Sequence, residues 1–167
     1  MILELEQHLD GVVTQGGNIV VYDVMRNQAH FGAADIDGHA LVWELSDPGP
    51  GDWLVRCDRV DFDPGGVALP HCHRGGGIRC LVAGALEVTV GDAAPRSVRP
   101  GGAWYESGRE PVLARASATE PTSFIRVSIL PAEIRGQSSI MYVDPADAAR
   151  GRPRRYTVWV DAPIALG

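Results

Sequence analysis

The chain of 167 residues is 45% hydrophobic and 22% charged, which is ordinary for one globular domain large enough to bury a core. A formal net charge of -6 argues against nucleic acid or an anionic membrane as the main partner. The acidic start, MILELEQHLD, is unlike a signal peptide, and no apolar run approaches the length of a membrane span. The three cysteines, Cys57, Cys72 and Cys80, form no Cys-x-x-Cys pair and indicate free thiols, so we expect a cytoplasmic protein.

Residues 1–32 carry the weakest pattern of the chain. One strand is expected there, over residues 18–24 (NIVVYDV), after a turn-like Gly-Gly pair. We expect this segment to be an arm that packs on the rest of the fold or on a second subunit. From His39 a β pattern begins, in which HALVWEL and WLVRCDRVDF are separated by the turn sequence DPGPGD.

The stretch over residues 64–90 organises the centre of the chain. It opens with a Pro-Gly-Gly turn and presents His71 and His73, two positions apart. In an extended strand such residues point to the same face, so the two imidazoles should project together and Cys72 should point away. Two converging imidazoles suit a divalent metal or acid–base chemistry.

Short strands at close spacing continue beyond this stretch. The last strong one covers residues 122–130 (TSFIRVSIL), and Pro131 ends it. The tail holds two more strand candidates, SSIMYV and YTVWV, around the basic patch RGRPRR (150–155), which we expect to be a solvated loop. Many short strands with little helical periodicity predict an all-β fold, here a double-sheet jelly-roll barrel whose mouth can hold a small ligand.

The central stretch resembles the first motif of the cupin superfamily, which reads glycine, five residues, His-x-His, three or four residues, glutamate, six residues, glycine. Four positions match this motif: Gly65, His71, His73 and Gly84. Gly77 stands at the position of the motif's glutamate. The resemblance therefore keeps the histidine pair and lacks one expected metal ligand.

The second cupin motif is similar to RPGGAWYESGREPVLARAS, residues 99–117. Gly101 matches its opening glycine, and residues 104–106 read as its strand, but the motif's histidine is missing at Pro111 or Val112. The resemblance covers residues 58–131 and implies a single RmlC-like barrel, also called a double-stranded β-helix.

The resemblance also divides the chain. Residues 1–32 form the N-terminal arm, residues 33–133 the cupin barrel core, and residues 134–167 a C-terminal extension that packs on the barrel. Because cupin barrels frequently pair, the resemblance implies a homodimer, with the arm and the tail as the dimerising elements.

A cupin metal would need three or four side chains, of which His71 and His73 remain. A divalent Fe, Mn, Ni or Zn ion would then need a recruited ligand, for which Glu106, His39 and Glu44 are the candidates. Glu106 comes first, as ligand or general base, because it ends the strand of the second motif. The alternative is a metal-free site in which the histidines act as acid and base.

Strand alternation predicts a substrate-binding face beside the histidines. If Gly77 faces inward, Arg79 and Leu81 share that face. An inward arginine needs an anionic partner, which is either the carboxylate or enolate of a substrate or a permanent ion pair with Glu106 or an aspartate. In a register shifted by one residue, Arg79 would instead be solvated. Trp104 shares a face with Glu106 and is expected to be a wall of the pocket. The loss of the motif's glutamate should leave space for a bulkier ligand.

The favoured function is a cupin-type enzyme that acts on a small, anionic organic substrate. The weakened ligand set favours a non-oxidative step, such as isomerisation, cyclisation or elimination by a lyase, in which His71, His73 and Glu106 carry the chemistry. One alternative is a binding or sensor protein that uses the same pocket without turnover. A metal-dependent dioxygenase is the other, but it would need iron held by at least three protein groups.

Overall fold

In this computed structural model, the structure describes residues 50–150 and 154–164, and, ahead of them, the backbone of five strands within residues 2–44. The strands are β1 (Ile2–His8), β2 (Gly11–Gln15), β3 (Val20–Asp23), β4 (Gln28–Phe31), β5 (Leu41–Glu44), β6 (Trp53–Phe62), β7 (Val67–His73), β8 (Gly77–Ala83), β9 (Leu86–Val90), β10 (Arg96–Val98), β11 (Ala103–Glu106), β12 (Val112–Ala116), β13 (Thr122–Pro131), β14 (Ile140–Tyr142) and β15 (Arg154–Ile164). Two short 3₁₀ helices, η1 (Ala132–Ile134) and η2 (Pro145–Ala149), lie in the tail. No helix in this described part has the length and apolarity needed to cross a membrane.

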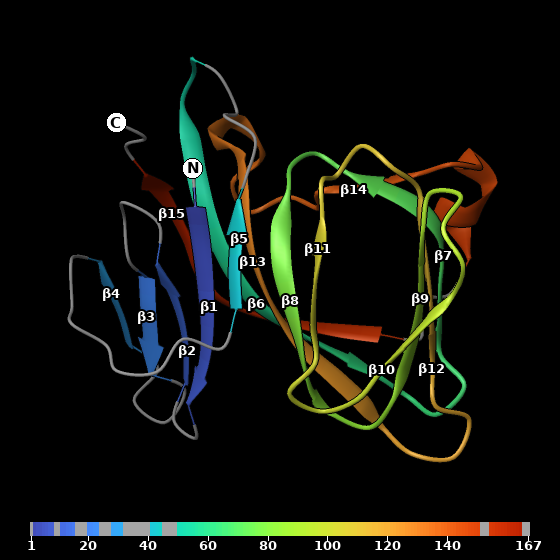
Figure 1. The fold of residues 1–167 in the computed structure, drawn as a ribbon. Coiled ribbons are helices and arrows are strands. Elements are labelled where there is room, and N and C mark those ends of the chain that lie inside the picture. The colour runs from blue at the N-terminus through green and yellow to red at the C-terminus, as the bar shows by residue number, and fades with distance from the viewer. Residues whose placement is uncertain are drawn as a thin grey trace.

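Strands β6 to β13 form a jelly-roll barrel of two antiparallel sheets (Figure 1). One sheet has the order β11-β8-β13-β6-β15 and the other the order β10-β9-β12-β7-β14. The chain passes from one sheet to the other at almost every turn, which is the connectivity of the double-sheet jelly roll. The all-β barrel predicted from the sequence is therefore confirmed.

Two glycines of the histidine motif make turns, Gly65 in the turn before the histidine strand β7 and Gly84 in the turn between β8 and β9. Gly65 and Gly84 both have a φ of 75°, a left-handed conformation that side chains rarely adopt. At Gly84 a Cβ atom would also lie 2.5 Å from the carbonyl oxygen of Pro121. The motif glycines thus serve the backbone path that brings β7, β8 and β9 together.

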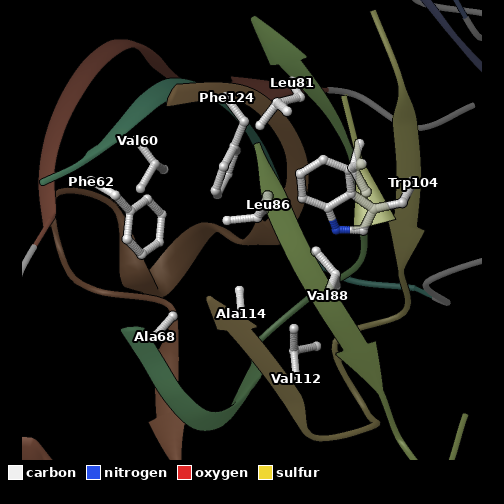
Figure 2. Packing of buried hydrophobic residues seen from close by; sticks show 11 residues of the cluster. Val60, Phe62, Ala68, Leu81, Leu86, Val88, Trp104, Val112, Ala114 and Phe124 are labelled. Carbon is white, nitrogen blue, oxygen red and sulfur yellow. The ribbon is translucent and has the colours of Figure 1, made fainter. Parts of the chain in front are cut away.

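Alternating side chains fill the inside of the barrel with apolar groups. Figure 2 shows Phe62, Phe124 and Trp104 lying toward one another between the two sheets. The ring centroids of Trp104 and Phe124 are 5.3 Å apart in an edge-on arrangement. Because the other face of the β6, β8 and β13 sheet carries a second apolar cluster, both faces of these strands are buried.

The first part of the chain forms a five-stranded sheet of its own, where the sequence predicted one strand within residues 1–32. Its strands have the order β4-β3-β2-β1-β5, and β1 contacts β8 of the barrel (Figure 1). Strand β5 covers part of HALVWEL, which we expected to begin the barrel, but it pairs with β1. The barrel strands begin only at Trp53.

The tail adds one strand to the edge of each barrel sheet. Strand β14 pairs with β7 beside the two histidines, and β15 pairs with β6 along its whole length. The expected solvated loop at the basic patch is wrong for Arg154, which begins β15 and is only 7% exposed. Arg155, the next residue, points to solvent, because successive strand residues face opposite sides.

Candidate functional site

Both motif histidines lie side by side inside the barrel. His71 and His73 are 5% and 6% exposed, and their ring centroids are 4.8 Å apart with an angle of 87° between the ring planes. Cys72 points away, as strand alternation predicted, and its Sγ donates to the carbonyl oxygen of Arg109. The strand thus delivers both imidazoles to one cavity.

Each imidazole is held through its Nδ1 atom. Nδ1 of His71 lies 2.6 Å from the carbonyl oxygen of Leu69, which can only accept, so this nitrogen carries the proton. Nδ1 of His73 lies 3.2 Å from the hydroxyl oxygen of Ser139. In neutral His71 the Nε2 atom is consequently an unprotonated base, and the residue lines the cavity.

Burial keeps both histidines neutral. Burial is the main cause that lowers the pKa of His71. Burial, together with the positive charge of Arg79, lowers the pKa of His73 well below its usual range. Both side chains are therefore proton acceptors at neutral pH, the form that acts as a general base or as a metal ligand.

Glu106 reaches the histidines from β11, the strand that pairs with β8, where Gly77 stands in place of the motif's glutamate. In the β8–β11 pairing, Glu106 lies directly opposite Gly77, so both share the inner face. Its Oε2 atom is 3.5 Å from Nε2 of His73, and its Oε1 atom accepts a hydrogen bond from Nε1 of Trp104 at 2.7 Å. A carboxylate is thus present beside the histidines, but it comes from β11 rather than β8.

The guanidinium of Arg79 contacts both Gly77, which stands at the position of the motif's glutamate, and the carboxylate of Glu106. It is 1% exposed, and its Nη1 donates to the carbonyl oxygen of Gly77 at 2.5 Å. Its Nη2 lies 2.8 Å from Oε2 of Glu106, an ion pair in which the N–H is not aimed at the oxygen. Burial lowers the pKa of Arg79 to about 10, so the guanidinium stays charged at neutral pH. Of the possibilities that the sequence left open for Arg79, the ion pair with Glu106 is the one present.

The loss of the motif glutamate has not opened the cavity. A Cβ atom on Gly77 would lie 2.2 Å from the carbonyl oxygen of Val127, because β13 packs directly against this position. The cavity beside the histidines has a volume of about 20 Å³, counted as the space that the centre of a water molecule can occupy. One water needs roughly 10–15 Å³ on that measure, so the expected room for a bulkier ligand is absent here.

The donor set does not fit a firmly held metal ion. Among the described residues, no three His, Cys, Asp or Glu side chains converge as a metal would require. Both oxygens of Glu106 are already engaged, by Trp104 and by the guanidinium of Arg79. Two imidazoles alone hold a divalent ion weakly. The other candidate ligands, His39 and the side chain of Glu44, lie outside the described residues.

The remaining predicted substrate-binding residues differ in their positions. Trp104 lines the cavity with one edge and is 4% exposed. Leu81 faces inward but is completely buried in the apolar cluster and does not line the cavity. Trp104 can therefore contact a ligand at the histidines, and Leu81 supports the wall behind it.

Three charged or polar groups of the site were missed in the sequence. Arg126 from β13 is bound to Asp58 from β6 through two hydrogen bonds, with both residues buried. Arg154 from β15 lines the cavity and donates from Nε to the hydroxyl of Tyr156. Ser139 holds His73 from the loop before β14. Extending strand alternation back from YTVWV to residue 154 would have indicated that Arg154 and Tyr156 share a face.

A larger chamber adjoins the histidine cavity. Its volume is about 310 Å³ on the same measure. Its lining shares Arg126, Ile140 and Tyr156 with the smaller cavity. Ser139 belongs to its lining, and its hydroxyl also contacts Nδ1 of His73, which lines the smaller cavity. A small organic molecule fits this chamber, whereas the inner cavity takes only a single small group.

A jelly-roll barrel with an inward His-x-His pair on its second strand has the cupin fold, and the resemblance predicted from the motif is confirmed at that level. No known family's sequence model matches the chain, and no curated protein matches its sequence.

Several solved structures are similar to the chain in fold. The DMSP lyase DddQ from Ruegeria pomeroyi is 20% identical, with a TM-score of 0.48 over 60% of this chain and 49% of that one. An oxalate oxidase solved with glycolate is 25% identical, with a TM-score of 0.42 over 53% of this chain and 46% of that one. The polyketide cyclase RemF from Streptomyces resistomycificus is 17% identical, with a TM-score of 0.41 over 59% and 68%. The chain thus spans about half the length of the first two structures.

Proposed function

We propose that this protein is a cupin-type enzyme that performs a non-oxidative reaction on a small organic anion, with His71 as the general base and no resident metal. The observation that carries this proposal is the anchoring of His71. Its Nδ1–H donates to Leu69, which leaves an unprotonated Nε2 on a neutral side chain that lines the cavity. The Arg79–Glu106 ion pair supports the metal-free alternative, because it engages the carboxylate that a metal would need.

The chemistry follows from these two groups. Isomerisation, cyclisation and elimination can all begin with the removal of a proton from carbon next to a carbonyl or carboxyl group. Nε2 of His71 takes that proton, and the electron pair of the broken C–H bond moves into the substrate as an enolate. The hydrogen bond from Nδ1 to Leu69 stabilises the imidazolium that forms. Returning the proton to another carbon or to a leaving group completes the reaction and restores neutral His71.

His73 and Glu106 have a supporting role in this proposal. Ser139 and Glu106 hold the two nitrogens of His73, so its ring is fixed beside that of His71. Glu106 in turn is held by Trp104 and Arg79. This chain of contacts positions the two imidazoles without a metal ion.

Proton abstraction can be tested before the physiological substrate is known. We expect the wild-type protein to catalyse exchange of the C3 protons of small 2-oxo acids, such as pyruvate, in D₂O. The His71→Ala variant should lose about 10²–10⁴-fold of that rate, the usual contribution of a positioned general base. Proton NMR measures the exchange. Cys72→Ala, on the opposite face of the same strand, is the matched control and should exchange like the wild type.

The exchange rate should also depend on pH in a defined direction. Because the pKa of His71 is lowered, the base form persists at pH values below the usual histidine range, and the rate should fall only in acid. Equal exchange rates in the wild type and in His71→Ala would remove His71 from the mechanism. Ligand binding without any exchange would instead favour the binding or sensor alternative.

We also propose that the protein is a homodimer, as the cupin resemblance implies. The tail exposes large apolar side chains, with Met141, Val143 and Val158 between 45% and 56% exposed. Sedimentation velocity at micromolar concentration should show a dimer, and Met141→Glu, which lies outside both cavities, should shift it toward the monomer. A wild-type protein that sediments as a monomer would contradict this expectation.

A further inference from the structure

Arg154 is a buried cation in the histidine cavity that has no carboxylate partner among the described residues. It is 7% exposed and lines the cavity together with His71. Its Nε donates to the hydroxyl of Tyr156, and its Nη2 donates to the hydroxyl of Tyr142 at 3.3 Å. Both partners are neutral, and the guanidinium carbon lies 5.9 Å from the centre of the Tyr156 ring, so the positive charge of Arg154 is held in place without a carboxylate to neutralise it.

The other buried arginines of the described residues differ in this respect. Arg56 is paired with Asp161, Arg79 with Glu106, and Arg126 with Asp58. A buried charge is costly unless an opposite charge compensates it, and each of these three arginines has a carboxylate partner. Arg154 is the exception, and it faces the cavity of the proposed base.

We propose that Arg154 binds the carboxylate of the substrate, and that the substrate is a small monocarboxylic acid with an uncharged polar body. This inference rests on the proposed function and adds its substrate class. One uncompensated guanidinium matches one carboxylate, which it can bind through two parallel hydrogen bonds. The ring of Tyr142, which orients Arg154, lies 6.3 Å from the ring of His71, so the bound carboxylate is adjacent to the base.

The two cavities divide such a substrate between them. The inner space of about 20 Å³ takes the head group and cannot take a whole organic molecule. The adjoining chamber of about 310 Å³ takes the body. Its charged residues are paired with one another, and the rest of its lining offers the hydroxyls of Ser138 and Ser139 beside the apolar Ile140 and Val158. That lining suits hydroxyl or carbonyl groups on a short carbon chain.

Binding measurements with three probes test this assignment. Pyruvate, inorganic phosphate and glycerol are titrated into the full chain, and chemical-shift changes of the backbone amides give the affinities. We expect the wild type to bind pyruvate in preference to phosphate and glycerol, and Arg154→Gln to bind pyruvate at least 10-fold more weakly. Arg155→Gln is the matched control, because Arg155 is the exposed neighbour and pairs with Asp63 at 3.0 Å. It should bind like the wild type.

Tyr142→Phe keeps the test decisive if Arg154→Gln does not fold. The half-buried Tyr142 loses only the hydroxyl that orients Nη2, so this variant should fold and bind pyruvate several-fold more weakly. Wild-type protein that does not bind pyruvate, tighter binding of phosphate than of pyruvate, or equal pyruvate affinity in Arg154→Gln or Tyr142→Phe and the wild type would overturn the inference.

The failure of this inference can be told apart from the failure of the proposed function. If Arg154→Gln binds pyruvate normally while His71→Ala loses proton exchange, the carboxylate assignment is wrong and the base assignment stands. If Arg154→Gln loses binding while the wild type exchanges no protons, Arg154 is an anion-binding residue in a protein that is not this kind of enzyme.

Discussion

Replacing Arg79 with methionine is expected to destabilise the barrel by about 3–5 kcal/mol, the usual cost of leaving one member of a buried ion pair without its partner. The Glu106 side chain is only 6% exposed, and Arg79 is the cation at 2.8 Å from it. Methionine fills much of the same volume, so the loss reports the charge rather than a cavity. Urea unfolding measures the change in the free energy of unfolding.

A double variant separates the ion pair from the packing. Arg79→Met with Glu106→Gln removes both charges, and we expect it to recover at least about 2 kcal/mol relative to the sum of the single variants. The exposed pair of Arg115 and Glu87, 3.5 Å apart, is the control, and Arg115→Met should change the stability by less than about 0.5 kcal/mol. Additive single and double effects at Arg79 and Glu106 would show that the two charges do not compensate each other.

Restoring the cupin glutamate by Gly77→Glu is expected to disrupt the barrel rather than to create a metal site. A side chain at this position meets the carbonyl oxygen of Val127 and, at 2.7 Å, the hydroxyl of Ser128. Since the backbone of β13 would have to move, we expect a loss of at least about 3 kcal/mol, or failure to fold. Thermal unfolding and the yield of soluble protein measure this result.

The same strand provides the control for this substitution. Ala83 ends β8 and is exposed, so Ala83→Glu adds the same side chain where nothing opposes it and should have little effect. The expectation would be contradicted if the Gly77→Glu protein were as stable as the wild type and bound one equivalent of a divalent metal. The packing of β13 would then leave room for a glutamate at position 77.

The barrel could be predicted because its signals are local. Period-two alternation and the turn glycines at positions 65 and 84 define strands that have few alternatives. The inward direction of Arg79 also followed from alternation along one strand. The boundary at the start of the barrel was harder to place, because a strand such as β5 carries the same pattern whether it pairs with β1 or with a barrel strand.

The site could be predicted only in part, because its composition depends on strand pairing. The position of Glu106 opposite Gly77 is set by the register of β8 against β11. Arg154 comes from a strand about 80 residues after the histidines, and its basic neighbours suggested a solvated loop. The size of the histidine cavity depends on the approach of β13 to Gly77, which no single segment encodes.

The metal content of the protein tests the central claim most directly. The protein is purified without chelator and without a metal-affinity tag, beside a His71→Ala, His73→Ala double variant, and both are measured by elemental analysis. We expect no near-stoichiometric iron, manganese, nickel or zinc in either protein, since Arg79 engages the carboxylate that a metal would need. Near-stoichiometric metal in the wild type that is lost in the double variant would contradict it and make the histidine pair a metal site.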